Sequence, residues 1–220
     1  MKRFLVLLAV VALFTTSAFA ASVVGSRHDL RATGGGTPTG NGLTEVCVSC
    51  HTPHQAPGAN AQDPLWNHTG TATTLFGVYG STTLNAAPTE IGGALMGSQS
   101  VSMLCMSCHD GTISVLSMYN PPNIATPTVT AVAGRIDGGG LIISNANVGI
   151  LLTNDHPVNF TYDATLALAD GGLINPPPAA RLIGGMVQCS SCHNVHDPAN
   201  TPFLVVANTG SALCLQCHIK

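Results

Sequence analysis

Charged side chains are scarce in this sequence. Asp, Glu, Lys and Arg make up 8% of the 220 residues, against roughly 25% in an ordinary soluble domain. Aromatic residues account for only 5%, and no basic patch is present that would attract a nucleic acid. The chain instead contains 24 Gly and 14 Pro. Long apolar helices are hard to build from this composition, so we expect something other than side chains to fill part of the interior. The low charge also favours self-association.

Long hydrophobic runs are absent after the first twenty residues, which excludes a transmembrane helix there. At the start, two basic residues precede an apolar stretch over residues 4–14, and residues 18–20 (Ala-Phe-Ala) follow. This order is typical of a secretory signal peptide with its cleavage site. We therefore expect residues 1–20 to be removed and residues 21–220 to form one secreted domain, extracellular or at the cell surface. The periplasm is the alternative location.

Cysteine is present in a single pattern. All eight Cys occur as four Cys-x-x-Cys-His motifs, numbered here motif 1 to motif 4 in chain order. The motifs consist of Cys47, Cys50 and His51; Cys105, Cys108 and His109; Cys189, Cys192 and His193; and Cys214, Cys217 and His218.

This motif is the attachment sequence of c-type haem. Two thiols separated by two residues can bond to both vinyl groups of one porphyrin, and the adjacent imidazole can then bind the iron. Disulfides, zinc sites and redox dithiols are the alternatives for Cys pairs. None of these explains a His directly after every pair. We therefore predict four covalently bound haems c, attached outside the cytoplasm.

Five further histidines are available as second axial ligands. They are His28, His54, His68, His156 and His196. Four irons need four such ligands, so the supply exceeds the demand by one, and we predict bis-His coordination by His28, His54, His156 and His196. His54 and His196 each follow a motif His by three residues and are placed to bind a neighbouring haem. His68 is the open case, since it can instead pack with Trp66. The Met residues are alternative ligands but are more typical of packing.

The fold expected from these features is a mostly irregular multihaem cytochrome c whose haems form the core. Short helices are expected at the motifs, with possible caps at Thr44, Ser100 and Ser211. Short strands are expected at residues 141–144 and 148–152, paired in a hairpin. Residues 175–180 (NPPPAA) are expected to form a rigid connector.

Several segments together resemble a known family. SRHDL, CVSCHTPHQAP, PLWNH, NDHPV and CHNVHD are similar to segments of the OmcE-type tetrahaem extracellular cytochromes, which polymerise into filaments called cytochrome nanowires. The resemblance implies a homopolymer in which one distal ligand comes from the neighbouring subunit. His28 is the expected candidate, because it lies near the start of the mature chain. The extra His68 departs from a strict count of four proximal and four distal histidines.

These observations favour a non-enzymatic electron carrier that passes electrons to other cytochromes or to an extracellular acceptor. A monomeric periplasmic shuttle is the first alternative, although it would be expected to carry more surface charge. A multihaem reductase with one open iron is the second, and the spare histidines argue against it. A structural surface protein without redox activity is the third.

Overall fold

The computed structural model describes residues 22–31, 34–36, 42–56, 65–71, 73, 76–86, 100–122 and 128–219. The segment interpreted as a signal peptide, residues 1–20, lies outside the described residues. Within the described ranges, no helix is long and apolar enough to cross a membrane.

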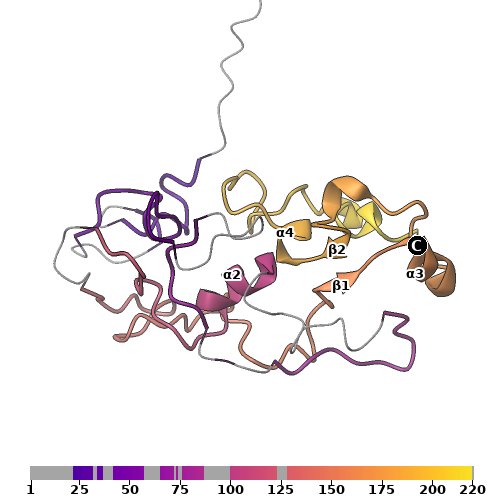
Figure 1. Cartoon of the computed structure of the whole chain (residues 1–220), viewed down its shortest axis with the longest axis horizontal. Helices are drawn as coiled ribbons and strands as arrows, with labels where there is room; N and C mark the ends of the chain where they lie inside the picture. The colour runs from indigo at the N-terminus through magenta and orange to yellow at the C-terminus, as the bar shows by residue number, and fades with distance from the viewer. Residues whose placement is uncertain are drawn as a thin grey trace, which may run out of the picture.

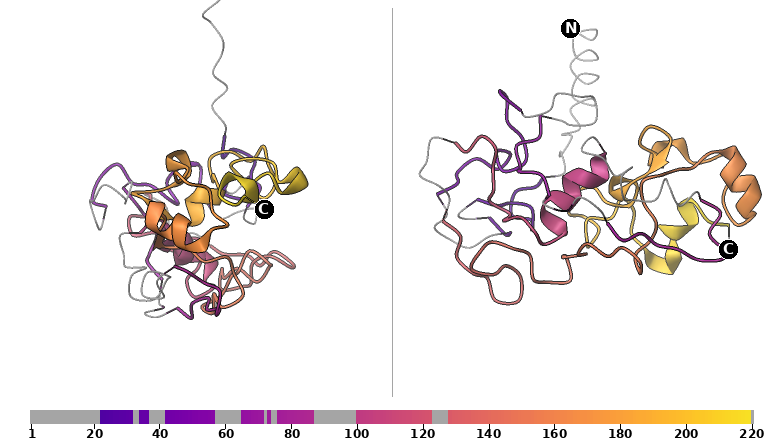
Figure 2. Two further views of the ribbon diagram at one scale, coloured as in Figure 1. Left: turned by 90° about the vertical axis from the view of Figure 1, so that its right-hand side faces the viewer. Right: turned by 60° about the horizontal axis from the view of Figure 1, so that its bottom comes forward.

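Regular structure is sparse and occurs in short pieces. The described elements are α2 (Val101–His109), β1 (Phe160–Thr161), α3 (Ala164–Asp170), η3 (Ala179–Arg181), β2 (Met186–Val187), α4 (Cys189–Cys192), η4 (Thr209–Ser211) and η5 (Cys214–Gln216). Figure 1 shows an elongated body with α2 near its middle and α3 close to the C-terminus at one end. The views of Figure 2 agree with this arrangement. The expected mostly irregular fold with short helices is confirmed.

The longest helix, α2, carries motif 2 and begins where the sequence predicts. Ser100 has extended backbone geometry, and its side chain accepts a hydrogen bond from the N–H of Met103, so it is the N-cap. The predicted caps at Thr44 and Ser211 are wrong. Residues 44–51 form turns rather than a helix, while Ser211 lies inside η4 and makes no cap for η5.

Motifs 2 and 3 are joined by the packing of α2 against α4. The N–H of Ser102 donates to Oε1 of Gln188 at 3.0 Å, and the N–H of Cys189 donates to Oγ of Ser102 at 3.1 Å. Ser102 and Gln188 are almost completely buried. Each helix therefore supplies an acceptor for a free amide at the start of the other.

The predicted hairpin at residues 141–152 does not form. Ile142 makes an isolated bridge with Ile136, and Leu151 makes one with Gly77. The two strands of the described sheet instead pair residues 160–161 with residues 186–187, antiparallel. The apolar residues at 141–152 bond to different parts of the chain, so local β-propensity did not decide their pairing.

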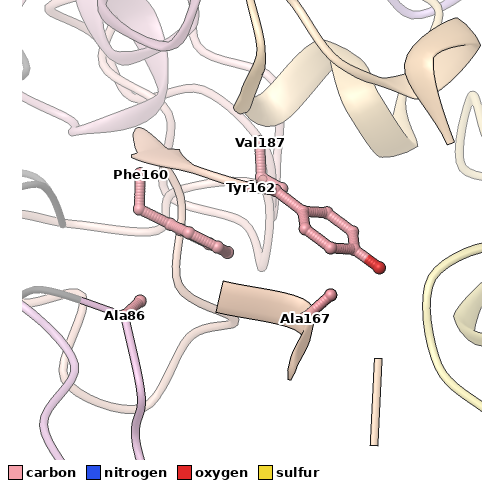
Figure 3. Close-up of a cluster of buried hydrophobic side chains, with 5 residues drawn as sticks. All are labelled: Ala86, Phe160, Tyr162, Ala167 and Val187. Carbon is pink, nitrogen blue, oxygen red and sulfur yellow. The ribbon is translucent and has the colours of Figure 1, made fainter. Parts of the chain in front are cut away.

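Within the described residues, buried apolar side chains form three small clusters rather than one core. Figure 3 shows the cluster of Phe160, Tyr162 and Val187 with Ala86 and Ala167. The second cluster contains Leu43, Val115, Leu116 and Ile136, and the third contains Phe76, Met106 and Leu152. Divided clusters of this size are in keeping with the low aromatic content of the sequence, which is 5%.

Candidate metal centres

Each Cys-x-x-Cys-His motif is built on one turn of helix-like backbone. In motifs 1, 3 and 4 the N–H of the His donates to the carbonyl of the first Cys, at 2.8, 3.0 and 2.9 Å respectively. Motif 2 forms the last two turns of α2. Residues three apart on such a turn lie on the same side, so the two thiols of each motif face the same region. None of the eight cysteines forms a disulfide.

A loop segment supports the His of every motif. Isolated antiparallel bridges pair motif histidines with extended residues elsewhere: His51 with Trp66, His193 with Leu204, and His218 with Leu173. For motif 2, the carbonyl of His109 accepts a hydrogen bond from Val148 at 2.8 Å. The sequence analysis missed these supports, because no local pattern marks a bridge of one residue.

Three motif histidines lie opposite a histidine from a distant part of the chain. The ring centroids are 6.0 Å apart for His109 and His28, 6.2 Å for His51 and His196, and 6.3 Å for His218 and His156. The rings of His51 and His196 are nearly parallel, at 18°, whereas the rings of the other two pairs are inclined at 51° and 76°. In each pair one histidine belongs to a motif and the other is one of the predicted distal ligands.

The spacing fits one iron between the two rings of each pair. A bond from an imidazole nitrogen to a transition metal is about 2 Å long, and the nitrogen lies roughly 1 Å from its ring centre, so ligands on opposite sides of one metal have ring centres about 6 Å apart. The three observed separations match this value. A c-type haem attached to the motif thiols would supply that iron.

Backbone carbonyls fix the tautomer of several of these rings. Nδ1 of His109 lies 2.6 Å from the carbonyl of Ala146, Nδ1 of His156 lies 2.8 Å from that of Pro157, and Nδ1 of His193 lies 3.0 Å from that of Pro202. A carbonyl only accepts, so Nδ1 carries the proton and Nε2 is left as a lone pair. This is the arrangement found in metal-binding imidazoles.

The ring of His28 lies beside His109 of its own chain, whereas the sequence analysis expected it to reach a neighbouring subunit. Its ring packs edge-on against Phe203, with centroids 4.5 Å apart, and its Nδ1 is buried without a hydrogen-bond partner. Burial lowers the pKa of His28 to about 4, and the nearby His109, His196 and His193 add to this effect. The ring is therefore neutral near pH 7, as a metal ligand must be.

The physical reason is that the segment around His28 is folded rather than extended. Asp29 is fully buried and accepts hydrogen bonds from the N–H of Gly25 and from the guanidinium of Arg31. Residues 34–36 (Gly-Gly-Gly) pack directly on this turn, where a Cβ at any of the three would overlap the backbone of residues 25–29. An arm closed in this way presents His28 inward to His109.

The ring nitrogens of His68 face backbone carbonyls rather than another histidine. The residue is buried, with Nδ1 2.8 Å from the carbonyl of Thr69 and Nε2 3.0 Å from that of Ser114. Nε2 also lies 3.3 Å from Sγ of Cys108. Backbone carbonyls thus face both nitrogens, although a neutral imidazole can donate from only one of them, and burial, which lowers the pKa of His68, favours the neutral ring. Trp66, the suggested packing partner of His68, instead lies edge-on to His51, with centroids 6.1 Å apart.

Two predicted ligands make no ring contact with another histidine in the described part of the chain, although one of them, His193, lies near His28. His193 of motif 3 has its Nδ1 anchored to Pro202, and its ring is exposed. His54 is also exposed, and its carbonyl accepts a hydrogen bond from Asn120 at 3.0 Å. One proximal and one distal ligand are thus left over, both at the surface.

The thiols of successive motifs lie close to one another. Burial, followed by the charges of Cys50 and Asp110, raises the pKa of Cys108 to about 12. Cys105 hydrogen-bonds to Cys189, which raises the pKa of Cys105 and lowers that of Cys189 to about 7.

Burial raises the pKa of Cys192, and the neighbouring Cys217 of motif 4 contributes to this shift. Motif 1 is therefore adjacent to motif 2, motif 2 to motif 3, and motif 3 to motif 4.

The C-terminal pair of motifs resembles a known sequence family. A family model described as a doubled CXXCH motif matches residues 183–220, which contain motifs 3 and 4. A search of curated proteins finds no match. Together with the histidine geometry, the matched motif indicates haem binding and electron transfer. The paired motif is that of a multihaem c-type cytochrome.

Proposed function

We propose that the chain is a secreted electron carrier with four c-type haems and that its copies join into a filament. The observation that carries this proposal is the distribution of histidine partners. Three motif histidines have a second histidine about 6 Å away within the chain, while His193 and His54 have none among the described residues and are exposed. His54 is therefore a distal ligand without a site, and His193 belongs to a site without a distal ligand, so each could complete the other.

In this proposal His54 of one copy completes the site of His193 in the next copy. The ligand and the site are two different surfaces of the same chain, so the contact is heterologous, and an assembly that does not close continues as an open filament. The scarcity of charge in the sequence favours such association. His54 thereby takes the intersubunit role that the sequence analysis gave to His28.

The role of the protein residues in electron transfer would be to hold the haems at fixed positions close to one another. Haem supplies an iron that gains and loses one electron. The adjacency of motifs 1 to 4 supports a continuous route along the subunit, and the contact of His54 with His193 would continue it into the next. With two histidines at every iron, no position is open for a substrate, which favours a carrier over an enzyme. The carrier would deliver its electrons to another cytochrome or to an extracellular acceptor.

The test compares His54→Gly with His196→Gly. Both residues occupy the second His of a Cys-x-x-Cys-His-x-x-His segment, but His196 is paired within the chain. We expect each variant to show one high-spin iron in four by electron paramagnetic resonance. Only His54→Gly should lose filaments in electron micrographs and remain monomeric in light scattering.

Two results would count against the proposal. Normal filaments of His54→Gly would exclude His54 as the joining ligand. A wild-type protein that stays monomeric at all concentrations, with four low-spin irons, would favour the soluble shuttle, in which His54 serves its own chain. A monomer with one high-spin iron at His193 would instead favour the reductase.

A further inference from the structure

A buried carboxylate lies directly beside the His28–His109 pair. Asp110 follows His109 in the chain and forms the C-cap of α2, and it is 4% exposed. Burial raises the pKa of Cys108, and the charge of Asp110 adds to this shift, which places Asp110 close to one of the two thiols of motif 2. Asp110 has no role in binding iron, so its burial needs another explanation.

The surroundings of Asp110 stabilise a negative charge without neutralising it. Its carboxylate accepts hydrogen bonds from the hydroxyls of Thr71, Thr73 and Thr112, the last two at 3.0 and 2.9 Å. The N–H of Thr112 also donates to it at 3.0 Å. The backbone N–H of Thr112 can only donate, and an ionised carboxylate can accept hydrogen bonds from all of these groups at once. No Lys or Arg within the described residues forms an ion pair with Asp110.

A negative charge on Asp110, at the C-terminal end of α2, is energetically unfavourable for two reasons. The C-terminal end of a helix carries negative partial charge, so a carboxylate there is unfavourable. Burial adds a further penalty. An Asn could accept hydrogen bonds from the same hydroxyls without either cost. A charge in this position would act on any metal held between His109 and His28, because Asp110 is buried and directly follows His109 in the chain.

The other acidic residues next to paired histidines are either neutralised by a cation or partly exposed to water. Asp29, beside His28, is neutralised by Arg31 at 2.6 Å. Asp155 and Asp197, beside His156 and His196, are only partly buried, so water weakens their fields. Asp110 is the buried acidic residue of the described chain that lacks a cation.

We propose that Asp110 lowers the reduction potential of the haem held by His109 and His28, and so sets the potential of this step in the electron route. A fixed negative charge in a low-dielectric site stabilises the ferric over the ferrous iron, because the ferric state carries one more positive charge. The hydrogen bond of His109 Nδ1 to Ala146 makes its imidazole a stronger donor and acts in the same direction. The inference rests on the proposed function only in requiring a haem at this pair.

The experiment is a spectroelectrochemical titration of the haem-loaded full chain. We expect Asp110→Asn to shift one of the four redox components to a more positive potential, with haem content and low-spin spectra unchanged. The shifted component should be the one that becomes high-spin in His28→Gly. The matched control is Asp197→Asn, at the same position after a paired His but partly exposed, and its shift should be clearly smaller.

A second variant covers the case in which Asp110→Asn gives too little folded protein. Thr73→Lys places a cation beside the retained carboxylate and should also raise one potential. If all four components stay at their wild-type positions in the variant that retains its haems, the proposed role of Asp110 is refuted, while haem binding and filament formation stand. Absence of haem from the wild-type protein would refute the proposed function itself.

Discussion

The contact between α2 and α4 holds motifs 2 and 3 together. Replacing Gln188 by Ala removes the acceptor for the N–H of Ser102, in a region where both residues are almost fully buried. An unsatisfied buried donor costs about 1–3 kcal/mol. We therefore expect Gln188→Ala to lower the free energy of unfolding by about 2 kcal/mol, a large part of a typical total of about 5–15 kcal/mol.

Guanidinium unfolding measures this loss. Trp66 is the single tryptophan and lies beside His51, so a haem at motif 1 would quench its fluorescence in the folded state and the signal would rise on unfolding. Gln216→Ala is the control, since Gln216 makes only a 3.3 Å bond within its own helical turn. Its loss should stay below about 0.5 kcal/mol. A Gln188→Ala loss as small as the control would contradict the reasoning. Combining it with Ser102→Ala should cost less than the sum of the single changes, because the two residues share one contact.

Three further outcomes are expected. His156→Gly should leave one iron in four high-spin at every protein concentration, because its pair lies within the chain; electron paramagnetic resonance checks this, and four low-spin irons would exclude His156 as a ligand. Gly35→Ala should displace His28 and produce a high-spin iron, because the added Cβ would overlap the carbonyl of Gly25; unchanged spectra would show that the turn is not needed. His68→Gln should retain all four haems by pyridine haemochrome assay but lower the unfolding free energy by about 1–3 kcal/mol; loss of a low-spin iron would make His68 a ligand.

The parts of the site that depend on short-range chemistry could be predicted from the sequence. The two thiols and the His of each motif must lie on one turn to bond to one porphyrin, so their spacing alone carries the information. The Ser100 cap of α2 is predictable for the same reason, because a capping side chain bonds to an amide only three residues away. The helix Ala164–Asp170 shows similar signals, Asp163 as cap and Gly171 in the left-handed conformation at its end, and the sequence analysis missed them.

The partners of the motif histidines could not be predicted, because they come from distant loops. Four distal candidates and four motifs allow many pairings, and nothing near His28 indicates that it faces His109. The prediction that His28 lies at an interface treated the chain end as a free arm. The buried Asp29 and the glycines at 34–36 instead close the arm into a turn, a contact that depends on three-dimensional packing.

The failed hairpin at residues 141–152 shows what the irregular loops do. Its residues do not pair with each other; the carbonyl of Ala146 instead accepts the Nδ1–H of His109, and the N–H of Val148 donates to the His109 carbonyl. The loop at residues 141–152 thus makes hydrogen bonds to both the ring and the backbone of His109. A regular hairpin would satisfy the same backbone groups internally and leave none for the histidine.

Motif 3 is held in the same manner by the loop at residues 202–205. The carbonyl of Pro202 accepts from Nδ1 of His193, and the N–H of Val205 donates to the carbonyl of Cys192 at 2.9 Å. His193 is therefore oriented for a metal although it lacks a histidine partner in the described chain. A ring oriented in advance loses less entropy when its partner arrives, which favours completion of this site by an incoming ligand such as His54 of another copy.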